Sequence, residues 1–281
     1  MKLLRYGPKG KEKPGILDRS GACRDLSGHI PDFTPDQLAP AALERLRKLD
    51  PQSLPPVAGT PRLGVPLAAI GKLVCVGLNY VDHAKEGGMQ IPSEPVLFLK
   101  AISSINGPND DVVLPKGAQK GDWEVELGIV IGTTAQYVAE HDALKHVAGY
   151  CIVNDVSERA FQMERGGQWT KGKSCDTFAP VGPWLVTADE IPDPQALDLV
   201  CEVSGQVMQK GTTRNMIFSC AQIVSYLSHF MTLAPGDVIP TGTPAGVGLG
   251  MKPPRFLKPG DAMRLTVSGL GEQRQRVLAY G

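Results

Sequence analysis

Two glutamates separated by one residue stand out within the segment Asp122–Gly132, which reads DWEVELGIVIG. In a β-strand, residues two apart point to the same face, so Glu124 and Glu126 are expected side by side, opposite the apolar residues that alternate with them. Neighbouring carboxylates repel and lose hydration on burial, and a bound cation relieves both costs. Oxygen ligands favour a hard ion such as Mg²⁺, Mn²⁺ or Ca²⁺. The alternative is an edge strand with a solvated acidic face.

A third carboxylate, Asp155, ends the apolar run Gly149–Val153. It precedes a predicted helix, 156–163, on which Arg159 and Gln162 are three residues apart and share a face. A forked cation and an amide next to a carboxylate suit an anionic substrate held beside a metal. Two alternatives stay open: Asp155 caps this helix, or it forms a surface salt bridge with Arg159.

A polar stripe is predicted on a short helix at 80–86, where Asn79, His83 and Glu86 follow one another at helical spacing. A carboxylate one turn from an imidazole can orient the ring and raise its basicity, as a general base requires. The glycine pair at 87–88 would let this helix move as a lid. The alternative is an exposed helix with an incidental ion pair.

Two further segments carry groups that could meet an anion. Lys173, in the sequence KGKS at 171–174, is a candidate to stabilise an oxyanion, or is simply solvated. The glycines and hydroxyls of Thr241–Gly248 could offer backbone N–H groups to a carboxylate. The glycine spacing there suggests a dinucleotide loop, but Pro253 and Pro254 forbid the helix that must follow, so we exclude that function.

Short strands dominate the elements that must position these groups, and they do not alternate with helices as in a doubly wound sheet. The pattern predicts an α+β, mostly β fold with few short helices. Strands are predicted at 3–6, 15–18, 72–76, 95–99, 112–114, 125–131, 150–153, 184–187, 197–203, 237–239, 262–267 and 273–278, and helices at 40–50, 140–147 and 219–231.

A Pro- and Gly-rich stretch at 54–66 reads as a linker. We therefore place a small N-terminal domain with its linker at residues 1–70 and a catalytic domain at 71–281.

Composition excludes several classes of protein. The 281 residues carry 29 Lys+Arg and 29 Asp+Glu without a basic run, which argues against nucleic acid or an anionic membrane as the main partner. No apolar run is long enough to span a membrane, and the polar start lacks the core of a secretory signal. Six scattered cysteines without a C-x-x-C pair indicate free thiols in a reducing compartment, so we expect a cytoplasmic protein.

In chain order, these motifs together resemble the fumarylacetoacetate hydrolase family. They are N-Y-x-x-H-x-x-E from Asn79, F-L-K at Phe98–Lys100, E-V-E-L at Glu124–Leu127, N-D-V-S-E-R from Asn154 with Gln162, G-K-S from Gly172, and T-G-T-P-A-G-V-G from Thr241. The resemblance covers roughly residues 72–277. It implies a mixed β-roll or sandwich of strongly bent sheets, a small N-terminal domain as in the short members, and a homodimer.

The resemblance also implies roles for individual residues. One divalent ion per active site, Mg²⁺ or Mn²⁺, is implied on Glu124, Glu126 and Asp155, with waters completing its coordination. Substrate contacts fall on Arg159, Gln162 and Thr243. Lys173 matches the lysine of the oxyanion site, and His83 with Glu86 matches the dyad of the lid helix.

The activity implied is metal-dependent hydrolysis of the C3–C4 bond of a 2,4-diketo acid, giving pyruvate and a second carboxylic acid. The chain looks most like hydrolases of 2,4-diketo-3-deoxy-L-rhamnonate or L-fuconate, enzymes of carbohydrate catabolism that yield lactate. Relatives named ureidoglycolate lyase, isomerases and decarboxylases of aromatic degradation, and oxaloacetate decarboxylases remain alternatives. His83 and Glu86 favour water attack or decarboxylation over pure isomerisation. A non-catalytic metal-binding protein is disfavoured because every motif position is filled.

Overall fold

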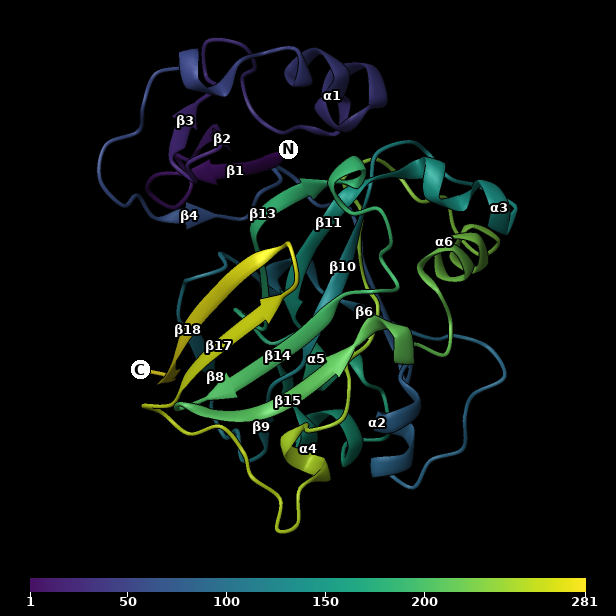
Figure 1. Ribbon diagram of the computed structural model, residues 1–281. Coiled ribbons are helices and arrows are strands. Elements are labelled where there is room, and N and C mark those ends of the chain that lie inside the picture. The colour runs from purple at the N-terminus through teal and green to yellow at the C-terminus, as the bar shows by residue number, and fades with distance from the viewer.

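The computed structural model describes residues 1–281 and contains two main β-sheets with few short helices (Figure 1). The larger sheet has the order β3 (Cys23–Asp25), β2 (Lys13–Leu17), β1 (Lys2–Tyr6), β13 (Ala179–Thr187), β11 (Val147–Asn154), β10 (Val125–Ile131), β16 (Val238–Pro240), β5 (Leu73–Gly77) and β6 (Val96–Lys100), with β4 (Leu63–Gly64) on β1 and β7 (Ile105–Asn106) on β13.

The second sheet has five strands, and a two-stranded ladder lies apart from both. The five-stranded order is β15 (Gln206–Thr212), β14 (Asp198–Val203), β17 (Ala262–Val267), β18 (Gly271–Ala279) and β8 (Val112–Leu114), and the ladder joins β9 (Gly121–Asp122) to β12 (Ser157–Glu158). A tight turn at Ser204-Gly205 joins β14 to β15 as an antiparallel hairpin.

The α-helices are α1 (Pro40–Arg47), α2 (Val81–Glu86), α3 (Glu140–Ala143), α4 (Arg159–Met163), α5 (Thr170–Lys173) and α6 (Cys220–Ser228). Short 3-10 turns lie at Pro35–Leu38, Pro51–Ser53, Ile102–Ser104, Leu144–His146, Ala188–Glu190, Thr213–Asn215 and Gly248–Gly250. The predicted mostly β α+β fold is confirmed.

Strand β10 divides its side chains between two hydrophobic cores. Its odd-numbered residues, Val125 to Ile131, join β14, β17 and α6 in one core. The even-numbered Val130 joins a second core with the N-terminal segment. The period-two pattern therefore assigned the faces of this strand correctly. The edge-strand alternative is wrong, because β10 is paired with β11 on one side and β16 on the other.

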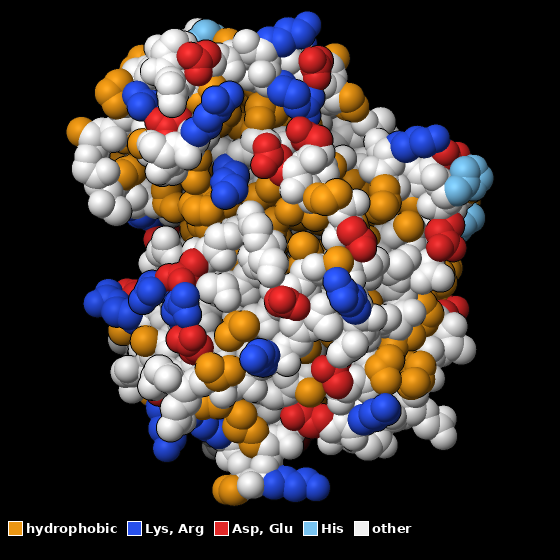
Figure 2. All heavy atoms as spheres, in the orientation of Figure 1, with side chains coloured by type: hydrophobic (Ala, Val, Ile, Leu, Met, Phe, Trp, Pro, Cys, Tyr) orange, Lys and Arg blue, Asp and Glu red, His pale blue; other side chains and the backbone are white.

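The N-terminal segment continues the large sheet through β1, which pairs antiparallel with β13. Its residues Phe33, Leu38 and Leu46 share the second core with Val130 and Leu185. Figure 2 shows hydrophobic atoms gathered in the hollow between this segment, at the top, and the body below, while charges of both signs are mixed over the rest of that face. The domain boundary near residue 70 stays a prediction.

The segment after Asp155 differs from the predicted helix at 156–163. Ser157 and Glu158 first form β12, and α4 begins only at Arg159. The Glu158 carboxylate accepts from Ala160 N at 3.1 Å and caps this helix, so Asp155 is not the cap. The predicted helix at 140–147 is likewise shorter, since α3 passes into a 3-10 turn at Leu144.

None of the helices is both long and apolar enough to cross a membrane. All six cysteines are free thiols, as predicted, and four of them are buried.

Candidate metal centre and active site

Three carboxylates meet at the end of the β10–β11 pair. Val125 faces Asn154 in this ladder, which brings Glu124 next to Asp155, and Asp155 N donates to Glu124 O at 3.0 Å. One oxygen from each of Glu124, Glu126 and Asp155 lies within 4.8 Å of the others, and all three residues are buried. The sequence-predicted ligands therefore come together, although 29 positions separate Glu126 from Asp155.

Three buried cations hold this cluster. The Lys173 ammonium bridges Glu124 Oε2 at 2.7 Å and Asp155 Oδ2 at 2.6 Å. Lys100 donates to Asp155 Oδ1 at 2.6 Å and to Val156 O at 3.0 Å. The Arg159 guanidinium donates to Glu124 Oε1 at 2.6 Å. Arg159 thus pairs with Glu124, and the surface salt bridge to Asp155 considered from the sequence does not form.

The two glutamates have opposite electrostatic environments. Burial alone would raise the pKa of Glu124, but Lys173 and Arg159 together hold it well below its usual range. Burial and the neighbouring Asp155 and Glu124 raise the pKa of Glu126 well above its usual range. Glu126 accepts a hydrogen bond only from Gly242 N, at 2.8 Å. A cation is therefore most needed at Glu126.

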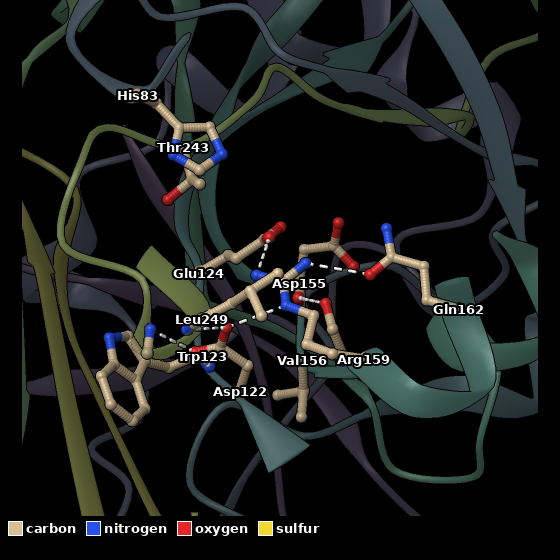
Figure 3. A network of polar contacts seen from close by, with 12 residues as sticks. His83, Asp122, Trp123, Glu124, Asp155, Val156, Arg159, Gln162, Thr243 and Leu249 are labelled. Carbon is tan, nitrogen blue, oxygen red and sulfur yellow. Dashed lines mark hydrogen bonds and ion pairs between the residues drawn. The ribbon is translucent and has the colours of Figure 1, made fainter. Parts of the chain in front are cut away.

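Asp122 links Arg159 to the loop that follows β16 (Figure 3). Its Oδ2 accepts from Arg159 Nε at 2.8 Å and from Leu249 N at 3.1 Å, and its Oδ1 accepts from Gly248 N at 2.7 Å. Arg159 Nη1 donates to Gln162 Oε1 at 3.0 Å. Arg159 and Gln162 share a face of α4, as predicted, and the bond to Arg159 turns the Gln162 amide nitrogen away to donate elsewhere.

A cavity of about 490 Å³ opens over this cluster. Its lining includes every residue predicted for the site except Asp155, whose two carboxylate oxygens accept from Lys100 and from Lys173. Thr243 lines the cavity, but its hydroxyl donates to Val125 O at 2.9 Å and accepts from Gln209 at 2.7 Å. A contact between this hydroxyl and a substrate requires one of those bonds to be shared or exchanged.

Helix α2 places His83 and Glu86 on the cavity wall. His83 Nδ1 lies 3.4 Å from Glu86 Oε2, and the Glu86 carboxylate accepts from Gly246 N at 3.0 Å. Burial would raise the pKa of Glu86, but the bonds from His83 and Gly246 lower it below its ordinary value. In Figure 3, His83 lies apart from the Arg159 network, with open space between them.

The predicted stripe of Asn79 with His83 and Glu86 is wrong, because α2 begins only at Val81. Asn79 is buried ahead of the helix, where its amide donates to Thr241 O at 2.8 Å and to Phe218 O at 3.1 Å and accepts from Phe218 N at 2.8 Å. This side chain ties the residue before α2 to the loop after β16.

The donor set fits a hard divalent cation. All three candidate ligands are carboxylates, and Glu124 and Glu126 face the cavity. Counting Asp122, four carboxylates meet three cations in this network, so one negative charge is left unbalanced when all four are ionised. Binding at Glu126 would remove the repulsion that raises its pKa.

Lys100 and Asp122 received no role from the sequence. Period-two spacing places Asp122 with the glutamates and turns Lys100 inward, but it does not bring Lys100 to Asp155. Asp122 is two residues before Glu124 and four before Glu126, which places it on the same face of an extended chain. Lys100 is two residues after the buried Phe98 on β6 and points inward with it, whereas Leu99 between them is exposed.

The family model for the fumarylacetoacetate (FAA) hydrolase C-terminal region matches residues 72–278. A Burkholderia ambifaria protein named "Putative hydrolase" is 62% identical over 276 residues, which cover 98% of each chain. These matches span nearly the whole catalytic region that the motifs had indicated.

Solved structures include both hydrolases and isomerases. A fumarylacetoacetate hydrolase of Exiguobacterium antarcticum has a TM-score of 0.85 at 36% identity, with 100% of each chain covered. A 2-hydroxyhepta-2,4-diene-1,7-dioate isomerase of Mycobacterium marinum has a TM-score of 0.75 at 35% identity, covering 100% of this chain and 99% of its own. The maleylpyruvate hydrolase of Sphingobium sp. SYK-6, solved with manganese(II) and pyruvate, has a TM-score of 0.81 at 28% identity and full coverage of both chains. The chain belongs to the fumarylacetoacetate hydrolase family.

Proposed function

We propose that this protein is a metal-dependent hydrolase that cleaves the C3–C4 bond of a 2,4-diketo acid, releasing pyruvate and a second carboxylic acid. The observation that carries the proposal is the buried carboxylate cluster on the floor of a cavity whose wall holds a His–Glu pair. A divalent ion, Mg²⁺ or Mn²⁺, bound to Glu124, Glu126 and Asp155 supplies Lewis acidity toward the 2-oxo group of the substrate. The manganese and pyruvate in the maleylpyruvate hydrolase structure support this assignment.

The carboxylate end of the 2-oxo acid, called the acid head below, is assigned to Arg159, Gln162 and Thr243. Arg159 is fixed by two carboxylates, and its bond to Gln162 leaves the amide nitrogen of that residue to donate to a substrate carboxylate. Arg159 and Gln162 need no rearrangement to meet an anion, which is what preorganised electrostatic stabilisation requires, whereas Thr243 must share or exchange one of its hydrogen bonds.

Lys173 is assigned to the developing oxyanion at C4. Burial would lower its pKa, but Asp155 and Glu124 raise it above the ordinary value, so the side chain stays an ammonium. A buried ammonium donates hydrogen bonds and cannot take a proton. Lys173 therefore acts as a donor, and the base must be found elsewhere.

His83 is assigned that role. It lines the cavity, and its Nδ1 donates to the Glu86 carboxylate. Nε2 is then the unprotonated ring nitrogen that can accept a proton. His83 takes a proton from water, the hydroxide adds to C4, and the C3–C4 electron pair passes to C3 as the bond breaks. Protonation of C3 completes pyruvate, and the acyl group leaves as a carboxylic acid, so one water is consumed for each substrate.

Isomerisation is the second candidate function, because a structural neighbour is named as an isomerase. It requires only that a proton leave the 2-hydroxyl and that a proton add at C5 of the diene, with no attack by water. Decarboxylation and ureidoglycolate lysis use the same acid-head groups. The sugar-acid substrates suggested by the sequence stay within the proposed hydrolase activity, as 2,4-diketo acids with a two-carbon group beyond C4.

Product analysis separates these activities. Purified protein with Mg²⁺ and 2,4-dioxopentanoate should release pyruvate and acetate in equal amounts, measured by proton NMR and a coupled NADH assay. Release of carbon dioxide and pyruvate from oxaloacetate, without cleavage of 2,4-dioxopentanoate, would establish a decarboxylase. Conversion of 2-hydroxyhepta-2,4-dienedioate without release of either acid would establish an isomerase.

We also propose that the protein is a homodimer that acts on a small 2-oxo acid without a nucleic-acid or membrane partner. Light scattering coupled to gel filtration should give twice the 30.0 kDa chain mass. A mass of one chain would contradict the dimer.

A further inference from the structure

The cavity has a polar floor and an apolar outer wall. Seven of its lining residues are ionisable, and all but Lys252 have been assigned above to the metal, the substrate carboxylate, the oxyanion or the His–Glu pair. The hydrophobic lining residues are Val76, Leu78, Met89, Phe98, Met163, Trp169, Val247, Leu249 and Met251.

An aromatic pair forms the part of this wall nearest the proposed oxyanion site. Phe98 and Trp169 pack edge to face with their centroids 5.5 Å apart. The Lys173 ammonium lies 5.0 Å from the centroid of the Phe98 ring. If Lys173 meets the C4 oxygen, the group attached beyond C4 lies within reach of these two rings.

Three exposed hydrophobic side chains form the rim. Met89, Met163 and Leu249 have exposures of 40%, 56% and 37%, and each comes from a different segment of the chain. Convergence of exposed apolar side chains on one opening is typical of a ligand site, because covering them removes apolar surface from water. Methionines adapt their shape to apolar ligands of different length.

Lys252 is the remaining cation that could hold a distal carboxylate. It is exposed, and an ion pair in water contributes little because the solvent screens it. The wall therefore offers strong binding to a hydrocarbon chain and weak binding to a second anion.

We infer that the outer cavity selects 2,4-diketo acids whose acyl group beyond C4 is an unbranched hydrocarbon chain, over those ending in a carboxylate or carrying several hydroxyls. This selectivity rests on the proposed function for the position of C4. It is a property of the outer wall, so it can be measured with 2-oxo acids that cannot be cleaved.

Binding of 2-oxobutanoate, 2-oxopentanoate and 2-oxohexanoate to the Mg²⁺-loaded protein by calorimetry tests it directly. Each added methylene should lower Kd about fourfold until the wall is filled. At six carbons, 2-oxohexanoate should bind more tightly than 2-oxoadipate and 2-oxo-3-deoxygluconate. A Kd that does not change with chain length, or tighter binding of 2-oxoadipate, would overturn the inference.

A charged side chain on the rim should abolish the preference for long chains. In Met163→Lys, the decrease in Kd with each added methylene should be largely lost. Val207→Lys, at a residue 58% exposed on β15 and outside the cavity, should leave it unchanged. Equal effects of the two substitutions would overturn the inference.

Hydrolysis of the matching 2,4-diketo acids separates the two proposals. Tight binding of long chains without cleavage would contradict the proposed hydrolase function but support the inferred selectivity. Cleavage with equal kcat/KM for short, long and acidic substrates would support the hydrolase function but contradict the selectivity.

Discussion

The floor and the wall of the cavity are built in opposite ways. On the floor, Lys100, Lys173 and Asp155 have side chains at most 3% exposed, and each carboxylate oxygen of Asp155 meets a lysine at 2.6 Å. On the wall, the six-residue helix α2 carries His83 and Glu86, with side chains 14% and 22% exposed. The Glu86 carboxylate holds this wall to the opposite loop through Gly246 N.

The difference matches two chemical tasks. Holding a cation and an anionic acid head requires charges fixed before the substrate arrives, and burial among cations on paired strands fixes them. A general base must exchange protons with water and let substrate in, which suits a short helix followed by glycine. Gly88, at φ +62°, has a backbone conformation that favours glycine at this point.

The largest expected effect is on the floor. Glu126→Gln should weaken Mg²⁺ binding at least about 100-fold and abolish turnover, because a neutral amide is a poor ligand for a hard cation. The metal-free variant should melt no lower than the parent, because the raised pKa of Glu126 shows that its charged form is disfavoured in the fold. Calorimetry and thermal melting check both. A variant that still binds Mg²⁺ normally would remove Glu126 from the ligand set.

On the wall, His83→Ala should lower kcat by about 10²- to 10⁴-fold, the usual contribution of a general base. Metal affinity should stay within about twofold, since the hydrogen bond of His83 is to Glu86 and none joins it to Glu124, Glu126 or Asp155. Steady-state kinetics and calorimetry on the same preparation measure the two quantities. Loss of metal along with activity would contradict the separation between wall and floor.

The effect of burial on the strength of an ion pair can be tested with two Lys–Asp pairs of the same length. Lys100 and Asp155 form a 2.6 Å pair with side chains 0% exposed, and Lys145 and Asp142 form a 2.6 Å pair with side chains 76% and 39% exposed. Lys100→Met should destabilise the fold by about 3–5 kcal/mol because it removes one of the two buried cations that hold Asp155 and leaves Asp155 Oδ1 and Val156 O without a donor.

The control substitution Lys145→Met should cost at most about 1 kcal/mol, because water replaces the lost partner. Urea unfolding measures both free energies. Similar losses of unfolding free energy in the two variants would show that a buried ion pair contributes no more to stability than an exposed one.

The smallest effect concerns the hydrogen bond between Glu86 and Gly246 N. The pKa of Glu86 is lowered in the fold. The carboxylate should therefore accept this bond fully above about pH 4.5, the pKa of a free glutamate, and lose it as the pH falls through the lowered pKa. The Gly246 amide resonance should be constant from pH 5 to 8 and move at lower pH. Glu86→Gln should abolish that movement. Movement above pH 5 in the parent would contradict the assigned direction.

The sequence predicted the strand β10, which carries Glu126, because alternation along 125–131 is a local property of the chain. It did not predict that β10 is central or that β1 joins β13, because strand neighbours depend on contacts far apart in the sequence. The helix after Asp155 was predicted too long, because the β12–β9 pairing overrides local propensity at Ser157 and Glu158.

The pairing of Glu124 with Glu126 could be predicted from period-two spacing, whereas Asp155 joined the predicted ligand set only through the family resemblance. The cations of the acidic cluster could not be assigned from spacing alone, since Lys100 meets Asp155 across 55 positions.

Asn79 was misplaced because helical spacing was extended past the true start of α2. The hydroxyl bonds of Thr243 depend on Gln209, on a different sheet.

Anomalous diffraction from crystals soaked in Mn²⁺ tests the central claim most directly. One peak should appear per chain, in contact with an oxygen of each of Glu124, Glu126 and Asp155, and it should vanish in Glu126→Gln. The absence of a peak there in the parent protein, or a peak held by other residues, would contradict the account.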